Sequence, residues 1–230
     1  MISPIPSQGK LLRIGHRGAA GHAPENTPAS LVEAVKFGVD LVEFDVRRSL
    51  DGALVLLHDQ TVDRTTNGHG NVETLPFRIL RGLDAGGGAR IPLLAEALEC
   101  LDERAGAMIE LKVAGIAAGV CAVVQAGHFQ RQVIFASFFQ EELVTGRSLL
   151  VDAQTLALFE GEPIHPTDFV IDARPTHAGL ALASVTSGDV QALQGRGIRV
   201  FVFTVDKPDD IDRMKRLGVD GIISNFPERM

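Results

Sequence analysis

The sequence predicts an α/β protein with the (β/α)8 fold of a TIM barrel, extended by a β-hairpin and a small insertion after the second strand. Short β-rich runs alternate with longer amphipathic runs, which is typical of β-α units around a parallel sheet. Eight such units can be traced along the 230 residues, and barrels of this type typically need ~250. No Ser/Pro/Gly-rich linker or charge run divides the chain, so we expect one domain over residues 1–230.

The strands are expected where apolar, strand-like runs occur, and a ninth run is joined to the second of them through a turn. The eight predicted barrel strands are Leu11–His16, Leu41–Arg47, Ala107–Lys112, Gln132–Ser137, Gln154–Phe159, Asp168–Asp172, Arg199–Val205 and Gly221–Ser224. The ninth run is Ala53–His58. Only the ninth lies outside the alternation, so it is predicted to extend the sheet as an extra strand.

The turn before the ninth run predicts an antiparallel hairpin. Asp51-Gly52 between two apolar runs is a strong signal for a two-residue turn, because both central residues need positive φ. With that turn, Leu50 faces Ala53 and Asp45 faces His58, and such partners share a face with Cβ atoms ~5 Å apart. A shift of one residue would turn His58 to the other face.

Residues 60–90 are predicted to form a cap-like insertion between the hairpin and the next helix. Asn67-Gly68, Gly70 and the Gly86–Gly88 run predict a mobile, turn-rich segment. Its apolar side chains, Phe77, Leu80 and Leu83, allow two interpretations: contact with a bound ligand, or plain packing on the barrel.

Composition limits the partners and the location. The formal charge of −7 disfavours general nucleic-acid binding, which needs a cationic surface. The longest apolar runs, such as Ile116–Val124, are too short and too rich in Gly and Ala to span a bilayer. Residues 1–10 contain no apolar segment of a secretion signal, and the two cysteines form no CxxC pattern. We therefore expect a cytoplasmic protein without stable membrane insertion.

Five side chains suited to metal and acid/base chemistry stand at the ends of strand-like runs. They are His16, Glu43, Asp45, His58 and Glu110. Active sites of such barrels lie at the carboxyl ends of the strands, which would gather these groups on one rim. Side chains two apart on a strand share a face, so Glu43 joins Asp45, and Glu110 joins Lys112.

The three carboxylates predict a site for a hard divalent cation. Glu43, Asp45 and Glu110 offer only oxygen ligands, which suits Mg²⁺ or Ca²⁺ better than zinc. Against Arg17 and Lys112 they leave a local charge of −1, and a divalent ion would bring it to +1, so an anionic phosphodiester would then be attracted. The structural alternative is that the acids only pair with neighbouring cations, namely Arg17, Arg47 and Lys112.

The two remaining groups predict proton transfer. Imidazole near neutral pH can take a proton from an attacking oxygen or give one to a leaving alkoxide, and His16 and His58 form such a pair. The other histidines lie in loops or beside Gly and Pro and have no matched acidic partners, so we expect surface positions for His22, His69, His128, His165 and His177.

The chain resembles the glycerophosphodiester phosphodiesterase family, a group of phospholipase-C-like phosphodiesterase barrels. The resemblance covers nearly the whole chain and is carried by ordered blocks at compatible spacing. These blocks are Gly15-His16-Arg17-Gly18, Pro24-Glu25-Asn26-Thr27, Glu43-Phe44-Asp45-Val46, Asp51-Gly52, His58-Asp59, Arg64-Thr65-Thr66-Asn67-Gly68, Ile109-Glu110-Leu111-Lys112, Phe203-Thr204-Val205-Asp206 and Gly218-Val219-Asp220-Gly221-Ile222-Ile223.

The resemblance implies hydrolysis of glycerophosphodiesters to glycerol 3-phosphate and an alcohol, within lipid and glycerol metabolism. It implies a divalent metal held by Glu43, Asp45 and Glu110, with His16 and His58 as the catalytic pair. Arg17 and Lys112 match positions expected to hold phosphate oxygens. The first loop contributes Glu25 and Asn26, which either line the pocket or only organise the loop, since Thr27 and Pro28 are suited to the start of a helix.

Two departures from the family pattern concern the pocket wall and the end of the last strand. The family commonly has Trp-Thr-Val-Asn where this chain has Phe203-Thr204-Val205-Asp206, and an acid where this chain has Asn225 before Phe226. Neither is expected to touch the metal or imidazole groups, so we expect the chemistry to be kept, while the family's preference for the alcohol group cannot be carried over to this chain.

Two other functions fit parts of this pattern. A lysophospholipase D-type phosphodiesterase would use the same groups on lysophospholipids, but it would profit from an exposed apolar surface helix that the sequence does not show clearly. A non-catalytic phosphodiester-binding barrel should have lost a histidine or a metal acid, and all five are present. The alcohol group, the choice between Mg²⁺ and Ca²⁺, the acid and base roles of the histidines and the oligomeric state are left open.

Overall fold

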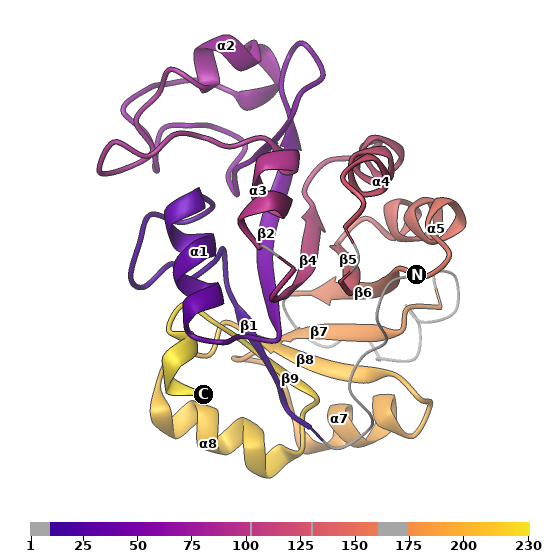
Figure 1. Ribbon diagram of the computed structural model, residues 1–230. Coiled ribbons are helices and arrows are strands. Elements are labelled where there is room, and N and C mark those ends of the chain that lie inside the picture. The colour runs from indigo at the N-terminus through magenta and orange to yellow at the C-terminus, as the bar shows by residue number, and fades with distance from the viewer. Residues whose placement is uncertain (1–9, 102, 130, 161–173) are drawn as a thin grey trace.

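A closed barrel of eight parallel strands forms the body of the molecule, as the alternation of strands and helices predicts (Figure 1). The computed structural model describes residues 10–101, 103–129, 131–160 and 174–230. The barrel strands are β1 Leu12–Gly15, β2 Leu41–Arg48, β4 Gly106–Leu111, β5 Val133–Ser137, β6 Gln154–Phe159, β7 His177–Ala181, β8 Arg199–Phe203 and β9 Gly221–Ser224. Pairing of β1 with both β2 and β9 closes the ring.

Helices cover the outside of the barrel. The described helices are α1 Pro28–Lys36, α3 Leu94–Cys100, α4 Ala117–Ala126, α5 Gln140–Leu149, α7 Ser187–Gln194 and α8 Pro208–Leu217, with a 3-10 turn at Pro227–Arg229. Pro28 opens α1, where its missing N–H costs no helical hydrogen bond. No helix in the described ranges is long and apolar enough to cross a membrane.

Side chains fill the barrel interior. One buried apolar cluster consists of inward-facing strand residues, among them Leu12, Met108, Leu156 and Phe201. Two larger clusters lie between the strands and the surrounding helices. The packed interior fixes where the strand ends lie, and these ends carry the polar side chains of the site.

The strand between β6 and β8 is not the one that the sequence predicts. The run Asp168–Asp172, the predicted strand, lies outside the described residues, and His177–Ala181 occupies the place between β6 and β8. The sequence of β7, His-Ala-Gly-Leu-Ala, is poor in the β-branched residues that mark strands. The expected surface position of His177 is therefore wrong: only 1% of this residue is exposed.

The hairpin forms, but its register differs by one residue from the predicted one. The extra strand β3, Leu54–Leu56, pairs antiparallel with β2 outside the ring, and Val46 is the partner of Leu56. The backbone N–H of Gly52 donates a hydrogen bond to the carbonyl oxygen of Ser49. The turn therefore consists of three residues, Leu50, Asp51 and Gly52. Three-residue turns with a left-handed glycine are the next most common hairpin connection, and Gly52 has a φ of 86°.

The insertion after β3 has a small apolar core of its own. It contains a 3-10 turn, Val72–Thr74, and the short helix α2, Phe77–Leu80, and it stands at the β3 side of the barrel (Figure 1). Leu80 is fully buried in this core, against which Phe77 and Leu83 pack. The core also takes in Val55 and Leu57 of the hairpin, so the apolar side of the insertion packs on β3.

Candidate active site

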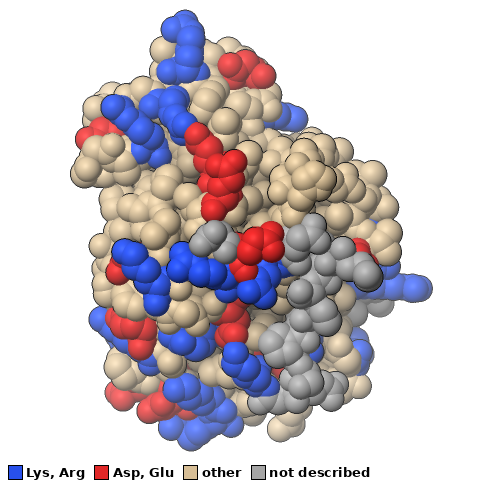
Figure 2. Space-filling view, viewed as in Figure 1, with Lys and Arg blue, Asp and Glu red and all other residues tan. Residues whose placement is uncertain are grey.

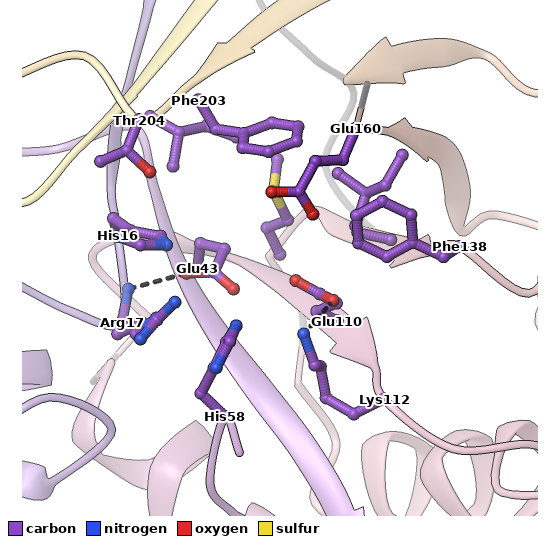
Figure 3. A pocket seen from close by; sticks show the side chains of 14 residues that line it. His16, Arg17, Glu43, His58, Glu110, Lys112, Phe138, Glu160, Phe203 and Thr204 are labelled. Carbon is purple, nitrogen blue, oxygen red and sulfur yellow. Dashed lines mark hydrogen bonds and ion pairs between the residues drawn. The ribbon is translucent and has the colours of Figure 1, made fainter. Parts of the chain in front are cut away.

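One cavity opens at the carboxyl ends of the barrel strands, and seven of the eight strands contribute to it. It has a volume of about 320 Å³. Figure 3 shows His16, His58, Glu43 and Glu110 pointing toward a common space, with Glu160 and the ring of Phe203 on the opposite wall. The lining residues are His16, Arg17, Glu43, His58, Met108, Glu110, Lys112, Ala136, Phe138, Leu158, Glu160, Phe203, Thr204 and Ile223.

Three carboxylates form a compact cluster, of which Glu43 and Glu110 line this cavity while Asp45 lies buried beside them. Oxygens of Glu43, Asp45 and Glu110 lie within 4.8 Å of one another. Glu43 and Asp45 are 4% and 1% exposed. Oε1 of Glu43 and Oδ1 of Asp45 are buried without a hydrogen-bond partner. Buried polar oxygens are normally paired, so this donor set fits a hard divalent cation that would take both oxygens as ligands.

The charges in the cluster are poorly compensated by the protein alone. Burial raises the pKa of Glu43 well above its usual value, and repulsion from Asp45 and Glu110 adds to this. Burial, followed by repulsion from Asp45, raises the pKa of Glu110 to about 7. Burial also disfavours ionisation of Asp45, but Lys112 and Arg17 outweigh it and lower the pKa of this carboxyl. A bound cation would favour the ionised form of all three.

Lys112 and Asn26 orient the carboxylates. Nζ of Lys112 donates to Oε1 of Glu110 at 2.7 Å and lies 3.6 Å from Oδ1 of Asp45. Asn26 donates from Nδ2 to Oδ2 of Asp45 at 2.7 Å and accepts from the Asp45 backbone N–H at 3.1 Å. Neither Asn26 nor Asp45 lies in the cavity lining, so Asn26 acts on the site by fixing the buried Asp45 beside Glu43 and Glu110.

The loop after β1 directs Arg17 into the site. Arg17 has a φ of 50°, a left-handed conformation that is uncommon for a residue with a side chain. This conformation lets its backbone N–H donate to Oε2 of Glu43 at 2.7 Å. Its Nη1 donates to Glu25 at 2.8 Å, while its buried Nε has no hydrogen-bond partner. Glu25 thus fixes the guanidinium of Arg17 by a hydrogen bond, and Glu25 itself does not line the cavity.

His58 reaches the cavity although its predicted cross-strand partner is wrong. In the observed register Leu57, and not His58, lies opposite Asp45, and its N–H donates to the Asp45 carbonyl. The ladder ends at Leu56, so the chain is free to turn the side chain of His58 into the cavity. Alternation along a strand therefore does not decide the direction of His58.

The carboxylate of Asp59 holds the imidazole of His58, and Arg64 holds that carboxylate in turn. Its Nδ1 lies 2.6 Å from Oδ1 of Asp59. Arg64 donates to both oxygens of Asp59 and to both oxygens of Glu25. This hydrogen bonding from Arg64 holds the pKa of Asp59 well below its usual range. Arg64 thereby links the insertion, the first loop and His58.

His16 has a neutral partner, Asn225, so the expectation that this departure from the family pattern touches no imidazole is wrong. Nδ1 of His16 lies 2.8 Å from Oδ1 of Asn225, which follows β9. The contact follows from the sheet, because Gly15 and Ser224 are register partners on β1 and β9. Burial, followed by the charge of Arg17, lowers the pKa of His16 to about 4. His16 is therefore neutral at pH 7, with its ring in the cavity wall.

The structure brings the predicted site residues together and adds several that the sequence pattern does not single out for a role. Asp59, Arg64 and Asn225 support the histidines: Asp59 contacts the adjacent His58, whereas Arg64 and Asn225 contact Glu25 and His16 in a distant loop. Phe138 and Glu160 extend the wall near Phe203, directly after β5 and β6 (Figure 3). Both residues directly follow a barrel strand, and active sites of such barrels lie at the carboxyl ends of the strands, so the sequence contains a signal for these two positions.

The outer surface around the site carries charges of both signs. Figure 2 shows acidic and basic side chains interspersed over this face of the molecule, with acidic groups gathered near its centre. The positive charge nearest the carboxylates belongs to the cavity lining, in Arg17 and Lys112. Attraction for an anion is therefore local to the cavity in this view.

Comparison with known proteins gives a consistent picture. Residues 16–229 match the model of the glycerophosphoryl diester phosphodiesterase family. A glycerophosphodiester phosphodiesterase of Caldanaerobacter subterraneus is 32% identical, in an alignment that covers 96% of this chain and 96% of the relative. One of Bacillus altitudinis is 32% identical, in an alignment that covers 93% of this chain and 94% of the relative.

Solved structures share the fold over the same length. A phosphodiesterase of Oleispira antarctica, in complex with the product sn-glycerol-3-phosphate, superposes with a TM-score of 0.87 at 28% identity, over 94% of this chain and 93% of the other. A glycerophosphodiester phosphodiesterase of Agrobacterium tumefaciens gives a TM-score of 0.81 at 30% identity, over 96% and 98% of the two chains.

Proposed function

Because the chain belongs to the glycerophosphoryl diester phosphodiesterase family, we propose that it hydrolyses glycerophosphodiesters to glycerol 3-phosphate and an alcohol with the help of Mg²⁺ or Ca²⁺. It is an enzyme of the phosphodiesterase class. The observation that carries the proposal is that two members of the carboxylate cluster, Glu43 and Glu110, line the same cavity as the two histidines. The sn-glycerol-3-phosphate described as the product of the Oleispira relative supports the same product here.

The carboxylates are proposed to hold the metal. Glu43, Asp45 and Glu110 supply oxygen ligands, and two of their buried oxygens accept no hydrogen bond. Such an ion, when bound, neutralises negative charge on the phosphoryl oxygens and makes the phosphorus more electrophilic. Lys112 keeps Glu110 turned toward Asp45, and Asn26 fixes Asp45.

Arg17 and Lys112 are proposed to bind the phosphate. The guanidinium of Arg17 is held by Glu25, and its Nε, 3.5 Å from Oδ2 of Asp45, makes no hydrogen bond. The side chain lines the cavity and carries a positive charge beside the carboxylates. Lys112 adds a second positive charge across the cluster. Fixed donors of this kind stabilise charge that develops on the phosphoryl group in the transition state.

The histidines are proposed to move the protons. One accepts the proton of the attacking oxygen, and the other gives a proton to the departing alkoxide. Both line the cavity, from the ends of different strands. The attacking oxygen is either water or a neighbouring hydroxyl of the substrate, which would give a cyclic phosphate first. Reaction in ¹⁸O-labelled water with rapid quench distinguishes them, because direct attack by water forms no cyclic species.

The proposed function is tested by product release from purified protein. Glycerophosphocholine and glycerophosphoethanolamine are incubated with Mg²⁺, with Ca²⁺ or with excess chelator, and glycerol 3-phosphate is measured. We expect release that requires metal and that is lost in Glu43→Gln. A matched control is Glu33→Gln, which removes a surface carboxylate paired with Lys36 and should leave release unchanged. No release from these substrates, with release from a long-chain lysophospholipid, would replace the proposal by the lysophospholipase D alternative.

A further inference from the structure

Asn225 lies between His16 and Asp206, in a part of the site that the proposed roles leave unexplained. Oδ1 of Asn225 is 2.8 Å from Nδ1 of His16. Its Nδ2 donates to Oδ2 of Asp206, also at 2.8 Å. The three residues follow β1, β9 and β8, which are neighbours in the barrel, so the sheet itself brings them together. Asp206 and Asn225 are also two of the three positions near the C-terminus, with Phe203, where the chain departs from the family pattern.

Asp206 fixes which end of the amide faces His16. Oδ1 of Asp206 accepts from the Asn225 backbone N–H at 2.9 Å and from the hydroxyl of Ser224 at 3.0 Å. An ionised carboxylate can only accept, so the side-chain contact requires the NH₂ group of Asn225 to face Asp206. The flipped amide would set two acceptors against each other and forfeit a charge-assisted hydrogen bond.

The amide orientation in turn fixes the position of the proton on His16. Oδ1 of Asn225 only accepts, so Nδ1 of His16 must be the donor. In the neutral ring this leaves a lone pair on Nε2. The ring lines the cavity and points toward the carboxylate cluster (Figure 3). An imidazole protonated at Nδ1 with a free Nε2 is the form that a general base needs.

We propose that Asn225, anchored by Asp206, is a positioning residue that holds His16 in the Nδ1–H tautomer and so makes Nε2 of His16 the proton acceptor. The inference rests on the proposed function and adds to it which histidine accepts a proton and which one donates a proton. The partner of His58 is instead the carboxylate of Asp59, at 2.6 Å. With His16 as the proton acceptor, His58 remains as the proton donor.

The resulting step is balanced in protons and bonds. A P–O bond forms to the attacking oxygen, whose proton passes to Nε2 of His16. The P–O bond to the alcohol breaks, and its electron pair leaves with the alcohol oxygen, which takes the proton of His58. Exchange with solvent water returns both imidazoles to their starting forms, so no further reactant is required.

A transposition of the two side chains tests the proposal. Asp206→Asn removes the acceptor that orients the amide, and Asn225→Asp puts two carboxylates against each other. We expect each to lower kcat about tenfold or more, with little change in KM, since the base and not the binding of substrate is disturbed. In the double variant the amide at 206 donates to the carboxylate at 225, which still accepts from Nδ1. We expect kcat to return to within about threefold of the parent, a coupling that independent effects would not give.

A spectroscopic measurement makes the test independent of turnover. In protein with ¹⁵N-labelled histidine, the ring signals of His16, assigned with His16→Gln, should show a protonated Nδ1 and an unprotonated Nε2. Asp206→Asn should shift them toward a mixture of tautomers. Asp220→Asn is the matched control, because Asp220 accepts from Val200 at the opposite end of the barrel, and it should leave the spectrum and kcat unchanged.

Three results would overturn the inference. They are an Nε2–H tautomer of His16 in the parent, an unchanged tautomer and kcat in Asp206→Asn, or a double variant no more active than the weaker single variant although it melts at the parent temperature. Failure of the proposed function is a different result, namely a parent protein that hydrolyses no glycerophosphodiester while the tautomer of His16 is as expected.

Discussion

Nδ1 of His58 lies 2.6 Å from Oδ1 of Asp59, the next residue in the chain. A third residue, Arg64, fixes the carboxylate of this pair, because its Nε donates to Oδ2 of Asp59 at 2.6 Å. Arg64 also reaches Glu25 in the first loop. The imidazole is thus fixed by a chain of charges that begins in the insertion.

The Asp59 carboxylate should be required for turnover. Asp59→Asn keeps the shape of the contact but removes the charge that stabilises an imidazolium, so we expect kcat to fall about 10- to 100-fold with KM nearly unchanged. Steady-state kinetics on glycerophosphocholine measure this. Asp63→Asn is the control, because Asp63 is an exposed acid of the same insertion that contacts His69. Equal losses in both variants would show that the insertion is only sensitive to charge.

Loss of either imidazole should nearly abolish turnover. We expect His16→Ala and His58→Ala each to lower kcat at least ~100-fold, the usual contribution of a general acid or base. His22→Ala is a suitable comparison: this histidine is exposed and pairs with Glu228. Calorimetric metal titration of each variant separates lost proton transfer from lost metal binding. Near-normal turnover in either catalytic variant would refute its assigned role.

Metal affinity should fall as the pH is lowered through neutrality. Burial, followed by repulsion from Asp45, raises the pKa of Glu110 to about 7 in the metal-free site. Below that pH the site holds a proton that a cation must displace, so binding weakens and releases a proton. Titration calorimetry at pH 6 and pH 8, in two buffers of different ionisation enthalpy, measures both effects. An affinity and a proton count independent of pH would contradict the prediction, and Glu110→Gln should bind more weakly with a smaller pH dependence.

Acid should destabilise the fold through His177. Burial, followed by the charge of Arg199, lowers the pKa of this histidine to about 3, whereas in the unfolded chain it titrates near 6.5. Between these values the unfolded state binds one more proton, so the free energy of unfolding drops by about 1.4 kcal/mol per pH unit from this group as the pH falls from 6.5 toward 3.

Urea denaturation at pH 7 and pH 5 checks the sign of this effect. His177→Gln should be less stable than the parent at pH 7, because His177 stacks on Phe201 with ring centroids 4.7 Å apart. Its loss of stability between the two pH values should nevertheless be smaller. His69→Gln, at a largely exposed histidine, should follow the parent curve. A parallel fall in the parent and in His177→Gln would rule out the buried imidazole as the cause.

Most of the barrel could be predicted from the sequence, because the signals are local. The strands other than β7 lie within a few residues of their predicted bounds, since each is an apolar run. The sequence does not indicate β7, because Gly179 has a low strand propensity. Only glycine fits at this position, since the side chains of Leu156 and Leu158 pack closely against it. The hairpin register was missed because a short sequence does not show whether Leu50 belongs to the strand or the turn.

The site could be predicted in part for the same reason. The metal acids and both histidines stand at strand ends, where the barrel topology alone brings them together. Their supporting partners depend on contacts that no local pattern encodes. Asn225 is 209 residues from His16, and Arg64 is 39 residues from Glu25. Recognition of such pairs requires the strand order and the loop conformations, which emerge only when the barrel closes.

The separate apolar core of the insertion has a consequence for how the enzyme fails on heating. Val55 and Leu57 share that core with Leu80, so the hairpin that carries His58 belongs to the same cooperative unit as the insertion. Units with their own core can open while the rest of a protein stays folded. We expect amide hydrogens of this unit to exchange before those of the barrel, and thermal inactivation to precede global unfolding. A relative with a better packed insertion would then gain operating temperature without any change in its barrel.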